Sequence, residues 1–347
     1  MSLANQKFGK SGLELPSLFF GATSLGNLFR EVPDADKSEI VEAWSNCGLR
    51  PFVIDSAGKY GAGLSLEVIG RELNRLDIPE DQAIVSNKLG WRREPLKGKE
   101  PTFEPGAWFG LKHDAVQDIS YDGILRCWEE GNALLGGRAA QLVSVHDPDE
   151  YLDAATDAQD RDRRFEDLVQ AYSALRELKH AGKVAAVGVG AKNWTAIEEL
   201  SHHCEFDWVM FANSFTVMRH PKPLSDFMHN LASKGAAIIN SALFQGGFLL
   251  GGDFFDYRRV DPSDPQDHER LQWRDSLVRV CKEFQCSPFE VGVAFGKAHP
   301  AVTAIALSSS RAERVQDHVH AMSVELAGDV WQRMREFGML EDYVDFV

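Results

Sequence analysis

The sequence predicts an α/β fold, a (β/α)8 TIM barrel that forms one domain over residues 1–347 and carries an N-terminal β-hairpin and extra C-terminal helices. Short apolar runs alternate eight times with longer amphipathic stretches, which is the pattern of strand–helix units. The apolar runs lack polar alternation, as expected for parallel strands covered on both faces. No linker rich in Pro, Gly or Ser divides the units, so a closed barrel is favoured over two domains.

The apolar runs give the expected strands. They cover Ser17–Ala22, Pro51–Asp55, Ala83–Lys88, Gln141–His146, Val184–Gly190, Asp207–Ala212, Ala236–Asn240 and Val302–Leu307. The amphipathic stretches predict helices at about 37–47, 64–75, 114–135, 165–181, 194–203, 222–234, 288–298 and 311–322. The opening segment, residues 7–15, is expected to form a hairpin around Lys10-Ser11-Gly12, outside the repeat, and to cap the lower end of the barrel.

Two insertions interrupt the regular spacing. Gly90 to His113 follows the third strand and contains Trp91 and Trp108, and Phe244 to Pro265 follows the seventh strand. Segments that follow barrel strands lie on the C-terminal face, where the reaction sites of this fold are found. Solvated loops pinned by their aromatic residues are the alternative interpretation of both insertions.

An open, doubly wound dinucleotide-binding sheet is the structural competitor. It requires Gly-x-Gly-x-x-Gly after the first strand, but Gly21 and Gly26 have the wrong spacing. The later Gly188-Val189-Gly190 has Asn193 where the third glycine belongs. The glycine pattern therefore disfavours this fold.

Composition narrows the possible partners and the compartment. The chain has 37 Lys and Arg against 52 Asp and Glu, a formal net charge of -15, which repels nucleic acids and anionic membranes. No apolar run is long enough to span a bilayer and the start does not resemble a signal peptide, so a cytoplasmic protein is expected. The five cysteines contain no Cys-x-x-Cys and predict free, buried thiols.

Four polar residues occur at or just beyond the ends of strands two, three and four: Asp55, Tyr60, Lys88 and His146. Adjacent barrel strands end on one rim, so these side chains are expected to meet in one pocket. An ammonium beside a phenol favours the phenolate, a carboxylate holds the ammonium, and an imidazole orients a substrate oxygen. Each residue alone is also compatible with a cap, a turn or packing; the coincidence favours a catalytic site.

Proton transfer by a tyrosine does not supply electrons, so an oxidoreduction at this site also requires a hydride carrier such as a nicotinamide. A metal hydrolase is the alternative, because His146, Asp147 and Asp149 form a cluster of potential ligands. Ligands in barrel hydrolases usually come from several strands and no His-x-His is present. No metal is therefore expected.

The motifs resemble those of a known family in order and in strand context. They are Asp55-Ser56-Ala57-Gly58-Lys59-Tyr60-Gly61, Ser86-Asn87-Lys88-Leu89-Gly90 and Val145-His146-Asp147-Pro148-Asp149. They are similar to the Asp, Tyr, Lys and His motifs of the aldo-keto reductases, and the resemblance runs from Phe8 to about His318. It implies a barrel that binds NAD(P) without a Rossmann unit, with Tyr60 as the catalytic acid or base.

The same resemblance implies the cofactor contacts. Those near the nicotinamide are Gly21, Ala22, Thr23 and Asp55, with Asn193 as a candidate for its carboxamide, and Asn213 on strand six is a further contact. Those at the pyrophosphate are Ser241, Leu243 and Gly246; those at the adenosine end are Ser308, Ser309, Ser310, Arg314 and His318. The chain departs from the family where Gly190-Ala191 replaces a Ser-Asn pair. Ser308 also stands where members that prefer NADP often have lysine, so the hypothesis is NAD, or dual use of NAD and NADP.

Residues 143–151 and 239–249 resemble the bacterial branch that contains aldose 1-dehydrogenases and pyridoxal 4-dehydrogenases. This implies oxidation of an aldose such as L-fucose at C1 to a lactone, with Tyr60 as the base and Trp91 or Trp108 stacking on the sugar. The alternatives are a pyridoxal 4-dehydrogenase, a general NADPH-dependent aldehyde or ketone reductase and, without catalysis, a cofactor-sensing subunit.

Overall fold

The computed structural model describes residues 3–256 and 258–347, and within them eight parallel strands close into a barrel. In barrel order they are β10 (Trp208–Ala212), β11 (Ala237–Ser241), β14 (Val302–Ser308), β3 (Leu18–Gly21), β4 (Phe52–Ala57), β5 (Ala83–Leu89), β8 (Leu142–His146) and β9 (Ala186–Ala191). The predicted (β/α)8 TIM barrel is confirmed, and each predicted strand is present within two residues of its expected bounds.

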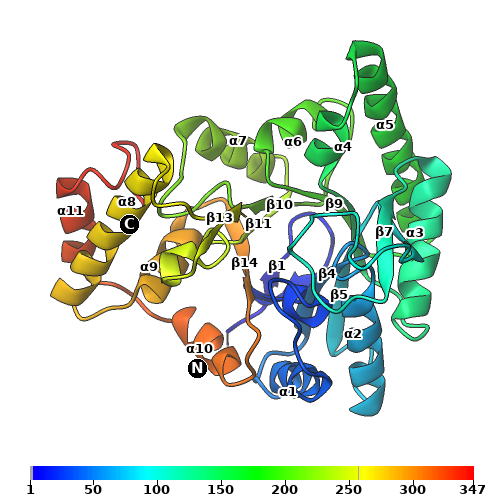
Figure 1. The fold of residues 1–347 in the computed structure, drawn as a ribbon, viewed down its shortest axis with the longest axis horizontal. Helices are drawn as coiled ribbons and strands as arrows, with labels where there is room; N and C mark the ends of the chain where they lie inside the picture. Colours follow the sequence, from blue (N-terminus) through cyan, green and yellow to red (C-terminus); the bar gives the residue numbers. More distant parts are fainter. Residues whose placement is uncertain (1–2, 257) are drawn as a thin grey trace.

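Helices surround the barrel (Figure 1). They are α1 (Asp34–Ser45), α2 (Leu64–Arg75), α3 (Tyr121–Leu134), α4 (Pro148–Asp153), α5 (Ala158–His180), α6 (Trp194–Leu200), α7 (Lys222–Ser233), α8 (Pro265–Glu283), α9 (Pro288–Ala298), α10 (Arg314–Ala321) and α11 (Gly328–Glu336). The main hydrophobic core lies between the strands and these helices. Among the described residues, no helix is both long and apolar enough to cross a membrane.

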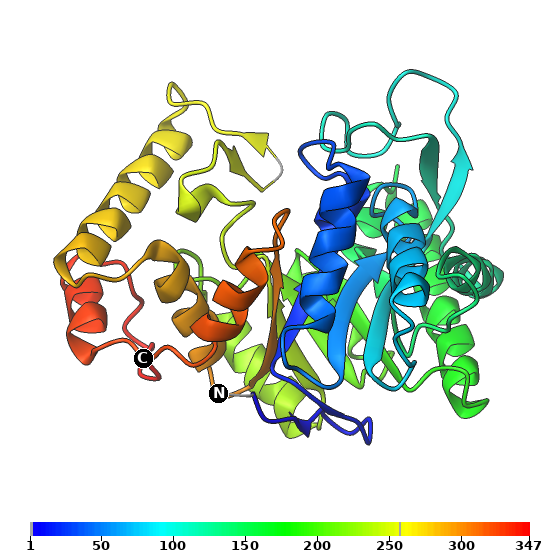
Figure 2. The ribbon, with the colours of Figure 1, turned by 90° about the horizontal axis from the view of Figure 1, so that it is seen from below.

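A second, smaller core fills the barrel interior, and the N-terminal hairpin closes it. The hairpin pairs β1 (Gln6–Lys7) with β2 (Glu14–Leu15), and its Phe8 packs into the same cluster as Phe19 and Trp208. Gly9 has φ +55°, and a Cβ there would lie 2.7 Å from the Ala237 nitrogen, so this approach requires glycine. The hairpin thus seals the lower end of the barrel, opposite the long loops (Figure 2).

The first insertion is more ordered than a loop. β6 (Trp91–Pro95) pairs antiparallel with β7 (His113–Gln117), and residues 96–112 connect them. The helix expected over 114–135 is therefore wrong at its start. Its first residues form β7, and the helix begins only after Ser120, whose side chain accepts a hydrogen bond from the Gly123 nitrogen.

The second insertion contains the 3-10 turn η2 (Phe248–Leu250) and the short strands β12 (Phe254–Phe255) and β13 (Arg258–Arg259). It leads into α8, a helix of 19 residues that the hydrophobic pattern does not predict. Only a few α8 positions, including Leu277, Val280 and Cys281, are buried, so the apolar stripe is too sparse to recognise.

The described cysteines are free, as predicted.

Candidate active site

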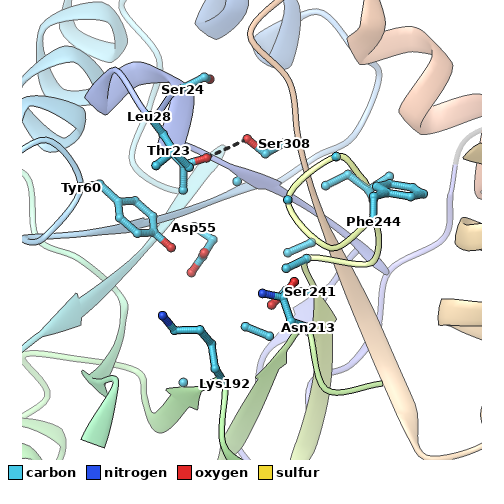
Figure 3. Close-up of a pocket in the computed structure, with 18 of the residues that line it drawn as sticks. Thr23, Ser24, Leu28, Asp55, Tyr60, Lys192, Asn213, Ser241, Phe244 and Ser308 are labelled. Carbon is cyan, nitrogen blue, oxygen red and sulfur yellow. Dashed lines mark hydrogen bonds between the residues drawn. The ribbon is translucent and has the colours of Figure 1, made fainter. Parts of the chain in front are cut away.

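A cavity of about 450 Å³ opens at the C-terminal end of the barrel. The ends of all eight barrel strands and both insertions contribute to its wall. The predicted site residues that line it are Gly21, Thr23, Asp55, Tyr60, Lys88, Trp108, His146, Asn213, Ser241, Leu243, Gly246, Ser308, Ser309 and Ser310. Figure 3 shows Tyr60, Asp55 and Lys192 on one side of this pocket and Phe244, Asn213 and Ser308 on the other.

Asp55 and Lys88 form a buried ion pair at the base of the pocket. Their strands, β4 and β5, are hydrogen-bonded neighbours, and the Lys88 Nζ lies 2.6 Å from the Asp55 Oδ2. Ser86 donates a hydrogen bond to the other carboxylate oxygen, and the Ser56 carbonyl accepts one from Lys88. These contacts fix the ammonium in one position despite its burial.

Tyr60 lies above this pair. The Lys88 Nζ is 4.7 Å from the centre of the Tyr60 ring, so the ammonium is in contact with the aromatic system. The His146 ring, from the end of β8, meets Tyr60 edge-on with the ring centres 5.6 Å apart. The four residues that the sequence singles out for chemistry therefore converge in one pocket.

His146 is buried, and burial lowers its pKa well below the usual value, assisted by the positive charges of Lys88 and Lys59. Its Nε2 is 3.4 Å from an Asp147 carboxylate oxygen. Its Nδ1 is buried and has no hydrogen-bond partner among residues 3–256 and 258–347. The imidazole is thus neutral around pH 7 and can donate or accept one hydrogen bond without adding charge.

The other half of the pocket is a cleft edged by hydroxyl groups and tied together across its rim. Thr23 and Ser308 share a 3.1 Å hydrogen bond (Figure 3), and the Ser24 hydroxyl donates to the Ser309 carbonyl. Arg30 donates to the hydroxyl and carbonyl of Ser310. The segment after β3 is therefore joined to the end of β14 along the cleft.

Five predicted residues do not line this pocket. Ala22 is fully buried, and Trp91 packs against the neighbouring small cluster. The exposed Asn193 caps α6 by accepting a hydrogen bond from the Thr195 nitrogen. Arg314 pairs with Asp317, and His318 stacks on Phe289, where burial lowers its pKa to about 4. The nicotinamide role expected of Asn193 is thus unsupported by the geometry.

The sequence does not identify all of the pocket residues, and four of those it misses are charged: Arg30, Lys59, Glu104 and Lys192. Lys192 is the first residue after β9, whereas Asn193 already belongs to the next helix, so an error of one residue in the strand end concealed it. Lys59 directly precedes Tyr60, and a lysine beside a catalytic tyrosine was an available signal. Arg30 and Glu104 lie in irregular segments, and the sequence pattern does not predict where such segments lie relative to the pocket.

A TIM barrel whose C-terminal mouth holds a tyrosine, a histidine and a buried lysine–carboxylate pair is compatible with a nucleotide-dependent oxidoreductase. Residues 17–338 match the aldo/keto reductase family, and the chain belongs to this family. It is accordingly an oxidoreductase, in a family that uses NAD(P)H and acts on small molecules.

Two characterised relatives match nearly the whole chain. The chain is 25% identical over 346 residues to pyridoxal 4-dehydrogenase of Microbacterium luteolum, covering 96% of each protein. It is 25% identical over 343 residues to D-threo-aldose 1-dehydrogenase of a Pseudomonas species, covering 97% of this chain and 98% of that protein. Both similarities are too distant to transfer a substrate.

Solved structures agree on the fold. A glycerol dehydrogenase from Gluconobacter oxydans has a TM-score of 0.70 with 16% identity and covers 100% of both chains. An aldo-keto reductase from Bacillus halodurans, in its holo form, has a TM-score of 0.69 with 17% identity and covers 99% of this chain and 98% of its own. These structures therefore share the barrel fold of this chain.

The residues of the cleft fit a nicotinamide dinucleotide. The Asn213 Oδ1 is buried in the pocket wall without a hydrogen-bond partner in the described part of the chain, and an amide group can satisfy it. Gly246 and Gly247 both have positive φ, which exposes backbone without side chains where the pyrophosphate is expected. The hydroxyls of Ser308, Ser309 and Ser310 follow along the same wall.

Proposed function

We propose that the protein oxidises an aldose of the L-fucose type at its anomeric carbon, C1, with NAD as the hydride acceptor. The observation that carries the proposal is the substrate side of the pocket. There Trp108 stacks on Tyr60 with ring centres 5.9 Å apart, and the carboxylates of Glu104 and Asp147 line the wall beside them. Aromatic rings that cover an apolar sugar face and carboxylates that accept hydrogen bonds from hydroxyl groups are the usual contacts of sugars.

Tyr60 is the proton acceptor in this reaction. The Lys88 ammonium, fixed by Asp55, favours the phenolate of Tyr60, which removes the proton of the C1 hydroxyl. The neutral His146 donates a hydrogen bond to the same oxygen and orients it. When bound, the nicotinamide dinucleotide supplies the acceptor for the C1 hydrogen and its electron pair. The sugar is thereby converted to a lactone.

We propose NAD rather than NADP because the polar side chains at the expected adenosine end of the cleft already have partners. The Ser308 hydroxyl is bonded to Thr23, and the Arg314 guanidinium is paired with Asp317 at 3.1 Å. Arg30 is already hydrogen-bonded to Ser310. A 2′-phosphate would have to compete for these groups. Steady-state constants for both cofactors test this point, and a preference for NADP of about a hundredfold or more contradicts it.

The test of the substrate is a panel at mildly alkaline pH with NAD. We expect NADH from L-fucose, L-galactose or D-arabinose. If pyridoxal is the only substrate oxidised, the protein is a pyridoxal 4-dehydrogenase, like its Microbacterium luteolum relative. Brisk reduction of simple aldehydes with NADPH, without sugar oxidation, overturns the proposal in favour of a general reductase. Tight cofactor binding without turnover of any substrate favours a cofactor-sensing subunit.

A further inference from the structure

Lys59 is a buried cation in contact with three carboxylates. Its Nζ lies 2.6 Å from Glu150, 2.8 Å from Glu104 and 3.1 Å from Asp147, and its side chain is 2% exposed. Asp147 and Glu150 belong to the segment after β8, whereas Glu104 comes from the first insertion. One ammonium group therefore joins the insertion to the barrel, immediately beside Tyr60.

The contact continues from Glu104 to the catalytic tyrosine. The second carboxylate oxygen of Glu104 accepts a 2.7 Å hydrogen bond from the Trp108 indole nitrogen. Trp108 in turn stacks on Tyr60. Glu104 has φ +43°, a conformation that a residue with a side chain adopts at a cost and keeps only when its surroundings hold it there.

The insertion rests on a small apolar cluster of its own. Phe103, Ala107 and Trp108 pack with Ala62 and Ala115, and the Tyr60 and Trp91 rings lie against them. The Lys59 Nζ is 4.9 Å from the Trp91 ring centre, so the cation also contacts the edge of this cluster. Hydrogen bonds of Asn27 and Phe29 to Phe109 and Ala107 also hold the insertion, and the Lys59–Glu104 pair adds a buried ionic contact at a different point.

Lys59 remains charged in this position. Burial by itself would lower its pKa, but the negative charges of Asp147, Glu104 and Glu150 outweigh burial and raise it. Removal of the ammonium would leave three neighbouring carboxylates without their common partner, and they would repel one another. Glu104 would then lose its direct ion pair with the barrel.

We propose that Lys59 is a positioning residue that anchors the insertion as a fixed wall of the substrate site and thereby sets Trp108 against Tyr60. The role in substrate binding rests on the proposed function, whereas the anchoring does not. Lys59 acts through Glu104 and Trp108 and transfers no proton itself. Its removal should loosen the wall and weaken substrate binding, with cofactor binding unaffected.

The test compares Lys59→Met with Lys37→Met, since Lys37 is also a buried lysine with a carboxylate neighbour but lies on α1, outside the pocket. We expect backbone hydrogen exchange over residues 99–112 to accelerate about tenfold in Lys59→Met and to stay unchanged in Lys37→Met. KM for the sugar should rise about tenfold while kcat falls less, with cofactor affinity within about twofold. Lys59→Arg, which keeps the positive charge, should show a smaller rise in KM than Lys59→Met.

Glu104→Ala provides a second variant in case Lys59→Met does not fold. It should accelerate exchange over the same residues, and a double variant should be no faster than Lys59→Met, because both changes break one contact. Unchanged exchange over residues 99–112 in either folded single variant overturns the proposal. Accelerated exchange in a protein that oxidises no sugar supports the anchoring and refutes only the proposed function.

Discussion

Asp55 illustrates how one side chain serves both the fold and the chemistry of the pocket. It forms an ion pair with Lys88 and accepts a hydrogen bond from Ser86, and Lys88 in turn lies against the Tyr60 ring. The sequence predicts these residues because barrel topology places consecutive strand ends on one rim. It selects Asn193, which caps α6, and misses Lys192, which lines the pocket, because the two residues are adjacent in the sequence.

Replacing Asp55 by alanine should cost stability as well as activity, since it leaves the Lys88 ammonium buried without its partner. We expect the free energy of unfolding to fall by about 3–5 kcal/mol. Asp34→Ala is the control, because Asp34 is the exposed partner of a buried lysine and should cost about 1 kcal/mol or less. Denaturant titration measures both. Equal losses of unfolding free energy in the two variants would show that the buried Asp55–Lys88 pair contributes no more to stability than an exposed ion pair.

The rim loops were located by the sequence, but their contacts were not. Phe29, in the segment after β3, stacks on Phe254 of the second insertion with ring centres 4.9 Å apart. The Phe29 nitrogen also donates to the Ala107 carbonyl of the first insertion. Such pairings join irregular segments that are distant in sequence, and hydrophobic periodicity carries no information about them.

Phe254→Ala should open this connection across the cleft. Because an aromatic pair contributes about 0.5–1.5 kcal/mol, we expect the dinucleotide to dissociate about two- to tenfold faster, with little change in the turnover of bound substrate. Stopped-flow tryptophan fluorescence measures the rate. Phe337→Ala, at an exposed ring that does not line the pocket, is the matched control. Identical dissociation rates in the two variants would rule out a role for the stack in cofactor retention.

For the molecule as a whole, the net charge of -15 makes local placement of cations decisive for an anionic cofactor. The sequence predicts this role for the Ser308–Arg314 segment; in the structure Ser308, Ser309 and Ser310 line the cleft together with Arg30, and Arg314 pairs with Asp317. The number of strand–helix units was predictable because it depends on the pattern of apolar and amphipathic stretches along the chain. The position of Arg30 was not, because it depends on how two loops meet.

Buried histidines should make the whole protein sensitive to acid. Burial lowers the pKa of His146, His220, His299 and His318, to about 4 for the last two. The unfolded chain binds protons near pH 6.5 and the folded protein does not, so stability is full above this pH and is lost as the pH falls towards 4. Two carboxyls act in the opposite direction against these four imidazoles: Asp149, whose pKa burial raises to about 6, and Asp256, whose pKa burial also raises.

Denaturant midpoints measured from pH 7 to pH 4.5 test this expectation. We expect a steady decrease, at up to about 1.4 kcal/mol per pH unit for each histidine that stays neutral. His299→Gln, at a buried site outside the pocket, should flatten the decrease. A midpoint that does not change over this range would mean that these imidazoles take up protons in the folded state.

The central claim, that Tyr60 transfers the proton, is tested most directly by Tyr60→Phe with a substrate that the wild-type protein oxidises. Loss of the phenol oxygen removes the proton acceptor but keeps the ring that packs on Trp108 and His146. We predict that kcat falls by about 10²–10⁴, with cofactor affinity and thermal unfolding unchanged. A variant that folds, binds cofactor and keeps more than about a tenth of wild-type turnover would contradict the account.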